Sequence, residues 1–173
     1  RDIPEVPFPD GFSMRPMRPD EVGLWTDIQR DAEPFIDDID AGLFMQEFGD
    51  DLEAIRWRCF LLTDAEGVAI GTISAWYSRE FRGQDYGRIH WFAIRPGHQG
   101  RGLGRAALSY AMQRLAEWHE RAWLATSTGR LAAIKLYLDF GFAPDLEPDG
   151  ARDAWREVAT YLDHPGLAGI EEI

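Results

Sequence analysis

A glycine-rich turn between an apolar segment and a long amphipathic segment constrains this chain more than any other feature. Residues 99–104 read Gln-Gly-Arg-Gly-Leu-Gly, and they lie between an apolar run at 88–94 and apolar residues at helical spacing over 102–119. A helix start exposes unpaired backbone N–H groups and the positive end of the helix dipole. Glycines let the backbone approach phosphate oxygens closely. With Arg101 and Arg105 nearby, the turn predicts a pyrophosphate site at a helix start.

Other interpretations of this turn are weaker. A tight strand-to-helix turn without a ligand would not need three alternating glycines flanked by two arginines. The chain has no Gly-x-x-x-x-Gly-Lys-Ser/Thr sequence, which excludes a Walker loop. Residues 102–107 match a loose dinucleotide fingerprint, but the next apolar run ends in Thr126-Ser127-Thr128 without the acidic residue that such a fold requires.

Composition narrows the class of protein. A chain of 173 residues with 45% apolar content predicts a single globular domain over 1–173. The net charge of −12 disfavours a nucleic-acid backbone as partner. No apolar window approaches the length of a membrane span, and no leader-like segment opens the chain. Cys59 is the single cysteine, which is compatible with a reducing cytoplasm, the location we expect.

The negative charge is concentrated in one segment. Residues 31–53 contain nine acidic side chains and no Lys or Arg, so they carry three quarters of the net charge. A solvated helical face would explain this pattern. A rim that attracts cations to the mouth of a substrate site would explain it equally well.

The order of elements predicts an α/β fold with a mixed, partly parallel central sheet of about six strands and helices on both faces. A Pro-rich irregular arm is expected at 1–11, a polar loop at 79–87 and an extra C-terminal helix at 149–162. Asp20 is expected to cap the first helix, which Pro34 ends. The expected strands cover 12–18, 57–63, 68–78, 88–94 and 122–126, and the other expected helices cover 40–48, 102–119 and 130–140.

A second motif lies at residues 133–142, Ala-Ile-Lys-Leu-Tyr-Leu-Asp-Phe-Gly-Phe. Arg130, Ala133 and Tyr137 fall on one helix face, where the small Ala133 would let a ligand chain lie close. On spacing alone, Tyr137 is typical of an ordinary half-buried tyrosine.

Together the two motifs resemble the GNAT superfamily of acetyl-CoA-dependent N-acetyltransferases. Residues 99–104 match the family's Arg/Gln-x-x-Gly-x-Gly/Ala signature in full, and Ala133-Ile134-x-Leu136-Tyr137-x-x-x-Gly141-Phe142 matches its later helix motif. The resemblance is firm over 88–142. Over 12–78 it rests on the order of elements.

The resemblance implies transfer of an acetyl group from acetyl-CoA, as co-substrate, to an amine that attacks directly. Tyr137 would protonate the departing thiolate. A strand amide would polarise the thioester carbonyl. No metal is implied, and the protein would be a monomer or homodimer. The implied coenzyme-binding residues are Phe92, Ala93, Ile94, Gln99, Gly100, Arg101, Gly102, Leu103, Gly104, Arg105, Arg130 and Ala133.

The acceptor must also lose a proton, because an alkyl ammonium titrates near pKa ~10. His90 is the candidate base, since it lies inside the buried strand and matches a strand histidine that the similar serotonin N-acetyltransferases use as a base. A core histidine bonded to backbone is an equally good interpretation. Glu80, Asp85 and a water chain are rivals.

Two departures from the family pattern affect the site. Arg130 stands where the family often has Asn, and Pro144, Pro148 and an expected helix replace the usual final strand pair. The acidic segment favours a cationic small molecule or a peptide amine as acceptor. A catalytically silent coenzyme-binding sensor or scaffold is the alternative function, and an acyl group other than acetyl is also open.

Overall fold

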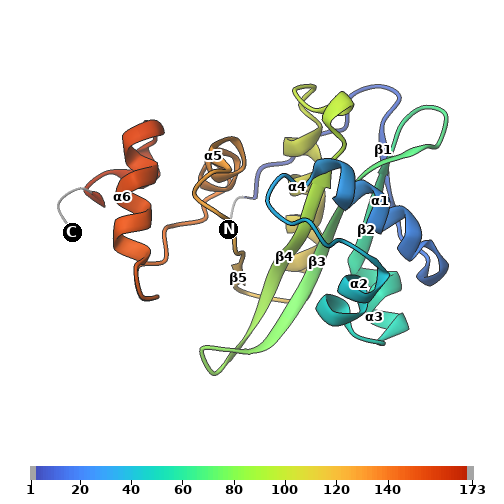
Figure 1. Cartoon of the computed structure of the whole chain (residues 1–173), viewed down its shortest axis with the longest axis horizontal. Helices are drawn as coiled ribbons and strands as arrows, with labels where there is room; N and C mark the ends of the chain where they lie inside the picture. The colour runs from blue at the N-terminus through green and yellow to red at the C-terminus, as the bar shows by residue number, and fades with distance from the viewer. Residues whose placement is uncertain (1–2, 171–173) are drawn as a thin grey trace. The chain divides into compact units, whose positions relative to one another are not determined.

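The computed structural model describes residues 3–170, which divide into two compact units (Figure 1). The N-terminal unit ends at Leu124 and the C-terminal unit begins at Ala125. No helix in the described residues is both long and apolar enough to cross a membrane.

The N-terminal unit is built on a five-stranded sheet in the order β1-β2-β3-β4-β5. The first four strands are antiparallel neighbours and β5 runs parallel to β4, so the expected mixed sheet is confirmed. The expected number of about six strands was wrong, because the chain after Phe142 forms a helix over 151–161 and no further strand within the described residues. The strands are β1 (Ser13–Pro16), β2 (Cys59–Thr63), β3 (Ala69–Phe81), β4 (Gln84–Ile94) and β5 (Ala122–Trp123).

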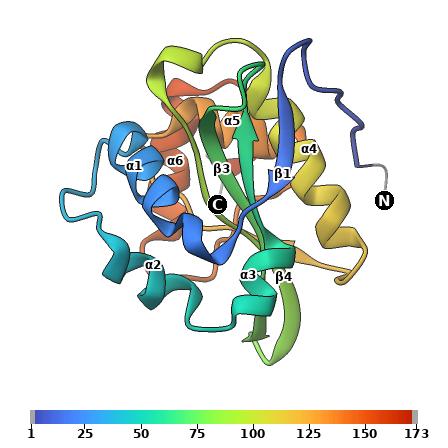
Figure 2. The ribbon, with the colours of Figure 1, turned by 90° about the vertical axis from the view of Figure 1, so that its right-hand side faces the viewer.

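Helices cover both faces of this sheet. α1 and α2 lie on one face and α4 lies on the other, with α3 near the end of the sheet (Figure 2). The helices of this unit are η1 (Pro19–Glu21), α1 (Val22–Ala32), α2 (Ala41–Phe48), α3 (Leu52–Arg58), η2 (Pro96–His98) and α4 (Leu103–Ala116).

An aromatic cluster packs α1 and α2 against the sheet. Trp25 of α1 is fully buried and meets Phe44, Phe48 and Trp91 edge-on, at ring-centroid distances of 5.1, 5.8 and 5.3 Å. Edge-to-face pairs of this kind add about 0.5–1.5 kcal/mol each beyond the burial of area. The cluster therefore fixes α2 against β4, where the functional residues lie.

Helix starts were predicted with mixed success. Asp40 caps α2 by accepting from the Leu43 N–H, at the start of the helix expected over 40–48. Asp20 does not cap α1, because it lies within the 3-10 turn η1. The strand expected from Trp57 begins at Cys59, since Asp51 caps the short helix α3.

The expected polar loop over 79–87 was also wrong. β3 continues to Phe81 and β4 begins at Gln84, so Arg82 and Gly83 alone form the turn. Both turn residues have positive φ, as the tightest hairpins require. The Phe81 ring stacks on that of Trp123 at 4.3 Å, which gives this polar-looking hairpin an apolar partner on β5.

The C-terminal unit has a small core of its own. It contains α5 (Leu131–Asp139), α6 (Ala151–Tyr161) and η3 (Pro165–Leu167), so the expected extra helix is confirmed. The His164 side chain lies 3.1 Å from Asp139 and ties the chain after α6 to the end of α5. The buried residues of this core are Ile134, Leu138, Val158, Leu167 and Ile170.

Two glycines should respond oppositely to alanine. A Cβ at Gly71 on β3 would lie 2.9 Å from the backbone oxygen of Ala93, whereas one at Gly23 on α1 would meet nothing within 4 Å. We expect Gly71→Ala to lower the free energy of unfolding by about 1–3 kcal/mol. Gly23→Ala should raise it by up to about 1 kcal/mol, because alanine favours a helix. Urea titration followed by tryptophan fluorescence would measure both, and equal effects would contradict the assigned packing.

Candidate active site

A bulge in β4 shapes the centre of the candidate site. Ser74 pairs with His90 and Thr72 pairs with Ala93, so one residue more lies on β4 than on β3 between the two pairs. Trp91 has φ of +48°, a left-handed conformation that is rare for a bulky side chain. Its backbone oxygen accepts a 2.9 Å hydrogen bond from Nε2 of Gln29, which is 2% exposed. Gln29 of α1 therefore holds the bulge in place.

The edge of β4 beside the bulge is open toward β5. β5 pairs with β4 only at Gly87 and Arg88, where Ala122 and Trp123 are the partners. Within the described residues, the stretch 89–94 therefore has no strand partner on that side. Phe92, Ala93 and Ile94, which the sequence assigned to the coenzyme, belong to this stretch. An extended chain of amides, such as a pantetheine arm, can pair with such an edge.

The glycine-rich turn directly follows this strand. Gly100 and Gly102 have φ of +76° and +79°, and a Cβ at either position would meet nothing within 4 Å. No backbone N–H over 100–104 has a hydrogen-bond partner in the described part of the chain, and no side chain caps α4. Five successive free donors at the start of a 14-residue helix form a cradle for an anion.

Side chains around the turn fix its position and add positive charge. Gln99 Nε2 donates a 2.8 Å hydrogen bond to the Ile94 oxygen, which ties the turn back to β4. Arg101 donates to the Gly97 oxygen at 3.2 Å. Arg101 and Arg105 are exposed, whereas Leu103 is buried and anchors the first turn of α4. Residues 99–105, which the sequence predicted as a pyrophosphate site, thus lie together in one turn before α4.

His90 lies beside the bulge on the α1–α2 face, with its ring tilted against that of Phe48 at a centroid distance of 5.0 Å. It is 5% exposed, and burial, aided by the positive charge of Arg88, lowers the pKa of its imidazole to about 3. Its Nε2 lies 3.1 Å from the Glu47 carboxylate but outside hydrogen-bond geometry, so this buried nitrogen is unsatisfied. Glu47 instead accepts a 3.0 Å hydrogen bond from Trp91 Nε1.

Arg130, Ala133 and Tyr137 belong to the C-terminal unit. Arg130 precedes α5 at its N-cap position, and Ala133 and Tyr137 lie on the helix. Although the Tyr137 side chain as a whole is only half-buried, burial raises the pKa of its hydroxyl to about 12. The hydroxyl is therefore protonated at pH 7 and has a proton to give.

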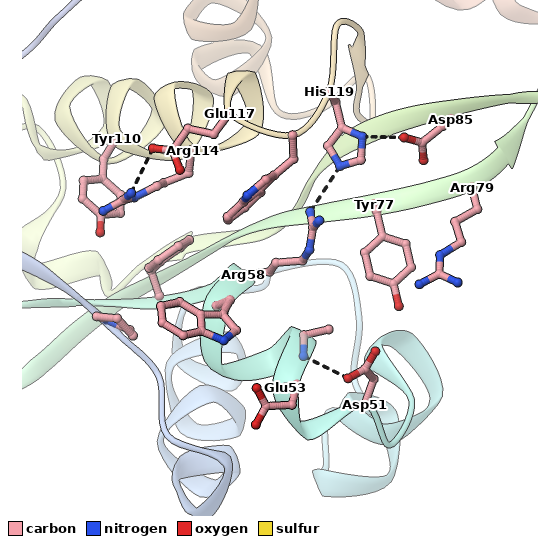
Figure 3. A pocket seen from close by; sticks show the side chains of 15 residues that line it. Asp51, Glu53, Arg58, Tyr77, Arg79, Asp85, Tyr110, Arg114, Glu117 and His119 are labelled. Atoms are coloured by element: carbon pink, nitrogen blue, oxygen red, sulfur yellow. Dashed lines mark hydrogen bonds and ion pairs between the residues drawn. The ribbon is translucent and has the colours of Figure 1, made fainter.

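A separate groove of about 760 Å³ lies between α3 and the C-terminal end of α4. Figure 3 shows His119 there between Arg58 and Asp85, with its two ring nitrogens 3.2 and 2.9 Å from these partners. Asp85 is thus paired in this groove, five residues along β4 from His90. Glu80, the other carboxylate that rivalled His90, is exposed on β3.

Two residues at the bulge had no assigned role from the sequence. Gln29 is an ordinary polar residue within an amphipathic helix, and nothing in its spacing marks it. Glu47 is one of nine acidic residues in 31–53, so the sequence marked its segment but not its position. Packing of α1 and α2 against β4 singles out both.

The buried His90 should make stability depend on pH. Because the folded pKa of about 3 lies below the ordinary 6.5, the unfolded chain takes up a proton first as the pH falls, and stability is lost from pH 6.5 downward. We expect the wild type to lose about 1.5 kcal/mol more than His90→Asn between pH 6.5 and 5.0. Urea unfolding at both pH values would measure this, and parallel losses would contradict the assigned environment of His90.

Known proteins resemble this chain in sequence. The sequence profile of the acetyltransferase (GNAT) family matches residues 23–142. A mycothiol acetyltransferase from Streptomyces avermitilis is 28% identical over 147 residues, which are 82% of this chain and 46% of that protein. A mycothiol acetyltransferase from Streptomyces coelicolor is 27% identical over 146 residues, which again are 82% of this chain and 46% of that protein. The chain therefore spans about half the length of the curated relatives it matches.

Solved structures share the fold at low sequence identity. The ribosomal-protein-S18-alanine N-acetyltransferase from Escherichia coli has a TM-score of 0.62 at 21% identity, covering 78% of this chain and 79% of that one. Rv2747 from Mycobacterium tuberculosis, solved in complex with CoA, has a TM-score of 0.57 at 16% identity, covering 93% of this chain and 89% of that one. The family profile, the open edge of β4 and the glycine-rich start of α4 agree, and the chain belongs to the acetyltransferase (GNAT) family.

Proposed function

We propose that this chain is an N-acetyltransferase that moves an acetyl group from acetyl-CoA to a primary amine by direct attack. One observation carries the proposal: the open edge of β4 ends at the five free amides of residues 100–104. The amides suit a pyrophosphate, and the strand edge suits the amide-bearing arm of the same coenzyme. Rv2747 and a NatC complex with a Gag peptide share the fold and were solved with CoA.

The acceptor that the charges favour is a cation. Residues 31–53 carry nine acidic side chains, and Glu47 of this segment touches the bulge. Such a field raises the local concentration of amines that are protonated at neutral pH. Two proteins that share the fold are linked to protein or peptide substrates by name: one is a ribosomal-protein-S18-alanine N-acetyltransferase, and the NatC complex was solved bound to a Gag peptide. These points support a cationic small molecule or a peptide amine as acceptor.

Within this proposal, each group has a chemical task. A backbone N–H near the bulge, at Phe92 or Ala93, would polarise the thioester carbonyl, as an oxyanion site does. Tyr137 would donate its proton to the departing thiolate. His90 is neutral at pH 7, which suits a site for the unprotonated amine. We further propose that the protein acts in the cytoplasm as a monomer or homodimer.

The direct test is release of coenzyme A thiol from acetyl-CoA with a panel of spermidine, aminoglycosides, glycinamide and short peptides with free N-termini. Turnover with acceptors that carry an alkyl ammonium would support the proposal. Acetyl-CoA binding in calorimetry with no turnover on any of them, at several pH values, would instead favour the catalytically silent sensor or scaffold.

The turn before α4 should matter for coenzyme affinity. We expect Gly102→Ala to raise the Kd for CoA tenfold or more, because the new Cβ and the strained φ disturb the cradle. Gly150→Ala is the matched control, since Gly150 precedes α6 with φ of +74° and an equally open surrounding. Both should lose about 1–2 kcal/mol of stability. Equal CoA affinities in calorimetry would remove the turn from the coenzyme site.

Tyr137→Phe should separate chemistry from binding. Loss of the proton donor should lower kcat about 100-fold, while the Kd for acetyl-CoA changes less than about twofold. Tyr161→Phe on α6 is the control, because that side chain is 73% exposed, and it should leave kcat unchanged. An unchanged kcat in Tyr137→Phe would take Tyr137 out of the mechanism.

A further inference from the structure

A carboxylate of α2 lies against the bulge of β4 and remains partly open to solvent. Oε2 of Glu47 accepts the 3.0 Å hydrogen bond from Trp91 Nε1 and lies 3.1 Å from His90 Nε2. The Glu47 side chain is 26% exposed, compared with 5% for His90. A ligand approaching from solvent would therefore reach the carboxylate before the imidazole.

Two buried nitrogen atoms of β4 are unsatisfied. His90 Nε2 and Arg88 Nε both lie out of contact with water and have no hydrogen-bond partner among the described residues. A buried polar group without a partner costs about 1–3 kcal/mol, and folded proteins rarely tolerate it away from functional sites. Because His90 lies beside Glu47, these two nitrogen atoms mark this part of β4 as a candidate for function rather than packing alone.

We infer that Glu47 is a catalytic residue, whose carboxylate pairs with the ammonium group of the acceptor and takes its proton. This inference rests on the proposed N-acetyltransferase function and names the residue that prepares the amine. Glu47 approaches from α2, whereas the candidate base that the sequence offered, His90, lies on the strand.

His90 is poorly suited to act alone as the base. Its burial and the charge of Arg88 make the imidazolium a strong acid, with a pKa of about 3, so the ring has little affinity for a proton. A neutral ring can still position Glu47 and the incoming amine. The negative charge that attracts an ammonium resides on Glu47, which is also the more exposed of the two groups and so the one that an amine contacts.

The protons and bonds of the reaction then balance. One proton of the ammonium passes to Glu47 and on to solvent, which frees the nitrogen lone pair. The nitrogen attacks the thioester carbon, so a C–N bond forms and the C–S bond breaks. Tyr137 protonates the thiolate, and the second proton lost from nitrogen replaces the one that Tyr137 gave. The third stays on the amide product.

The test assays two variants, each with one glutamate replaced by glutamine, and compares their activities toward two acceptors. Glu47→Gln keeps an oxygen that can accept from Trp91 but removes the charge and the base. Glu66→Gln is the matched control, since Glu66 is an exposed glutamate in the turn between β2 and β3, outside the acidic segment 31–53. The acceptors are the best alkyl amine of the panel and hydroxylamine, which is largely unprotonated at pH 7 and needs no base before attack.

We expect Glu47→Gln to lower kcat/KM for the alkyl amine about 100-fold and for hydroxylamine less than about fivefold. Glu66→Gln should stay within about twofold of the wild type for both. The Kd for acetyl-CoA should be the same in all three proteins, which shows that the variants are folded.

Three outcomes would overturn the inference. If Glu47→Gln behaves like Glu66→Gln, Glu47 has no part in the chemistry. If it loses hydroxylamine and alkyl amine activity equally, or loses acetyl-CoA binding, its role is structural. Both results leave the proposed function intact, because the wild type remains active. A wild type that acetylates neither acceptor would remove the proposed function, and this inference with it.

Discussion

The hydrogen bond from Gln29 to the backbone oxygen of Trp91 is the contact on which the rest of the site depends. A tryptophan with φ of +48° carries a strain of about 1–3 kcal/mol, which the surroundings must offset. The buried amide of Gln29 and the aromatic cluster around Trp25 supply that support. Because the bulge inserts a residue, His90 and Trp91 both face α1 and α2, while Phe92 turns to the α4 face.

Opposite charges are separated around the end of β4. The start of α4 presents free N–H groups and two arginines, which suit an anionic coenzyme. The α1–α2 side presents the acidic segment, from which Glu47 reaches the bulge. Under the proposed function, this separation would draw an anionic coenzyme to one side and a cationic amine to the other.

Local sequence signals predicted the elements that depend on local physics. The glycine turn, the long helix after it and the helix expected over 40–48 are confirmed, because each is set by backbone conformation and neighbouring residues, such as the Asp40 cap of α2. The missed helix α3 and the long β3–β4 hairpin have another cause. Trp57 looked like the start of a strand. The charged Arg79 and Glu80 looked like a loop, whereas Phe81 after them stacks on Trp123 of the distant strand β5.

The sequence by itself determined the family, the glycine-rich turn at 99–105 and the presence of an acidic segment, since each is written in consecutive residues. Tertiary structure alone decided the bulge, the burial of His90 and the choice of Glu47 among nine acidic residues. The contacts responsible join residues 62 and 44 positions apart, Gln29 to Trp91 and Glu47 to Trp91. Such contacts form only when α1 and α2 pack on the sheet, and residue spacing along the chain does not encode that packing.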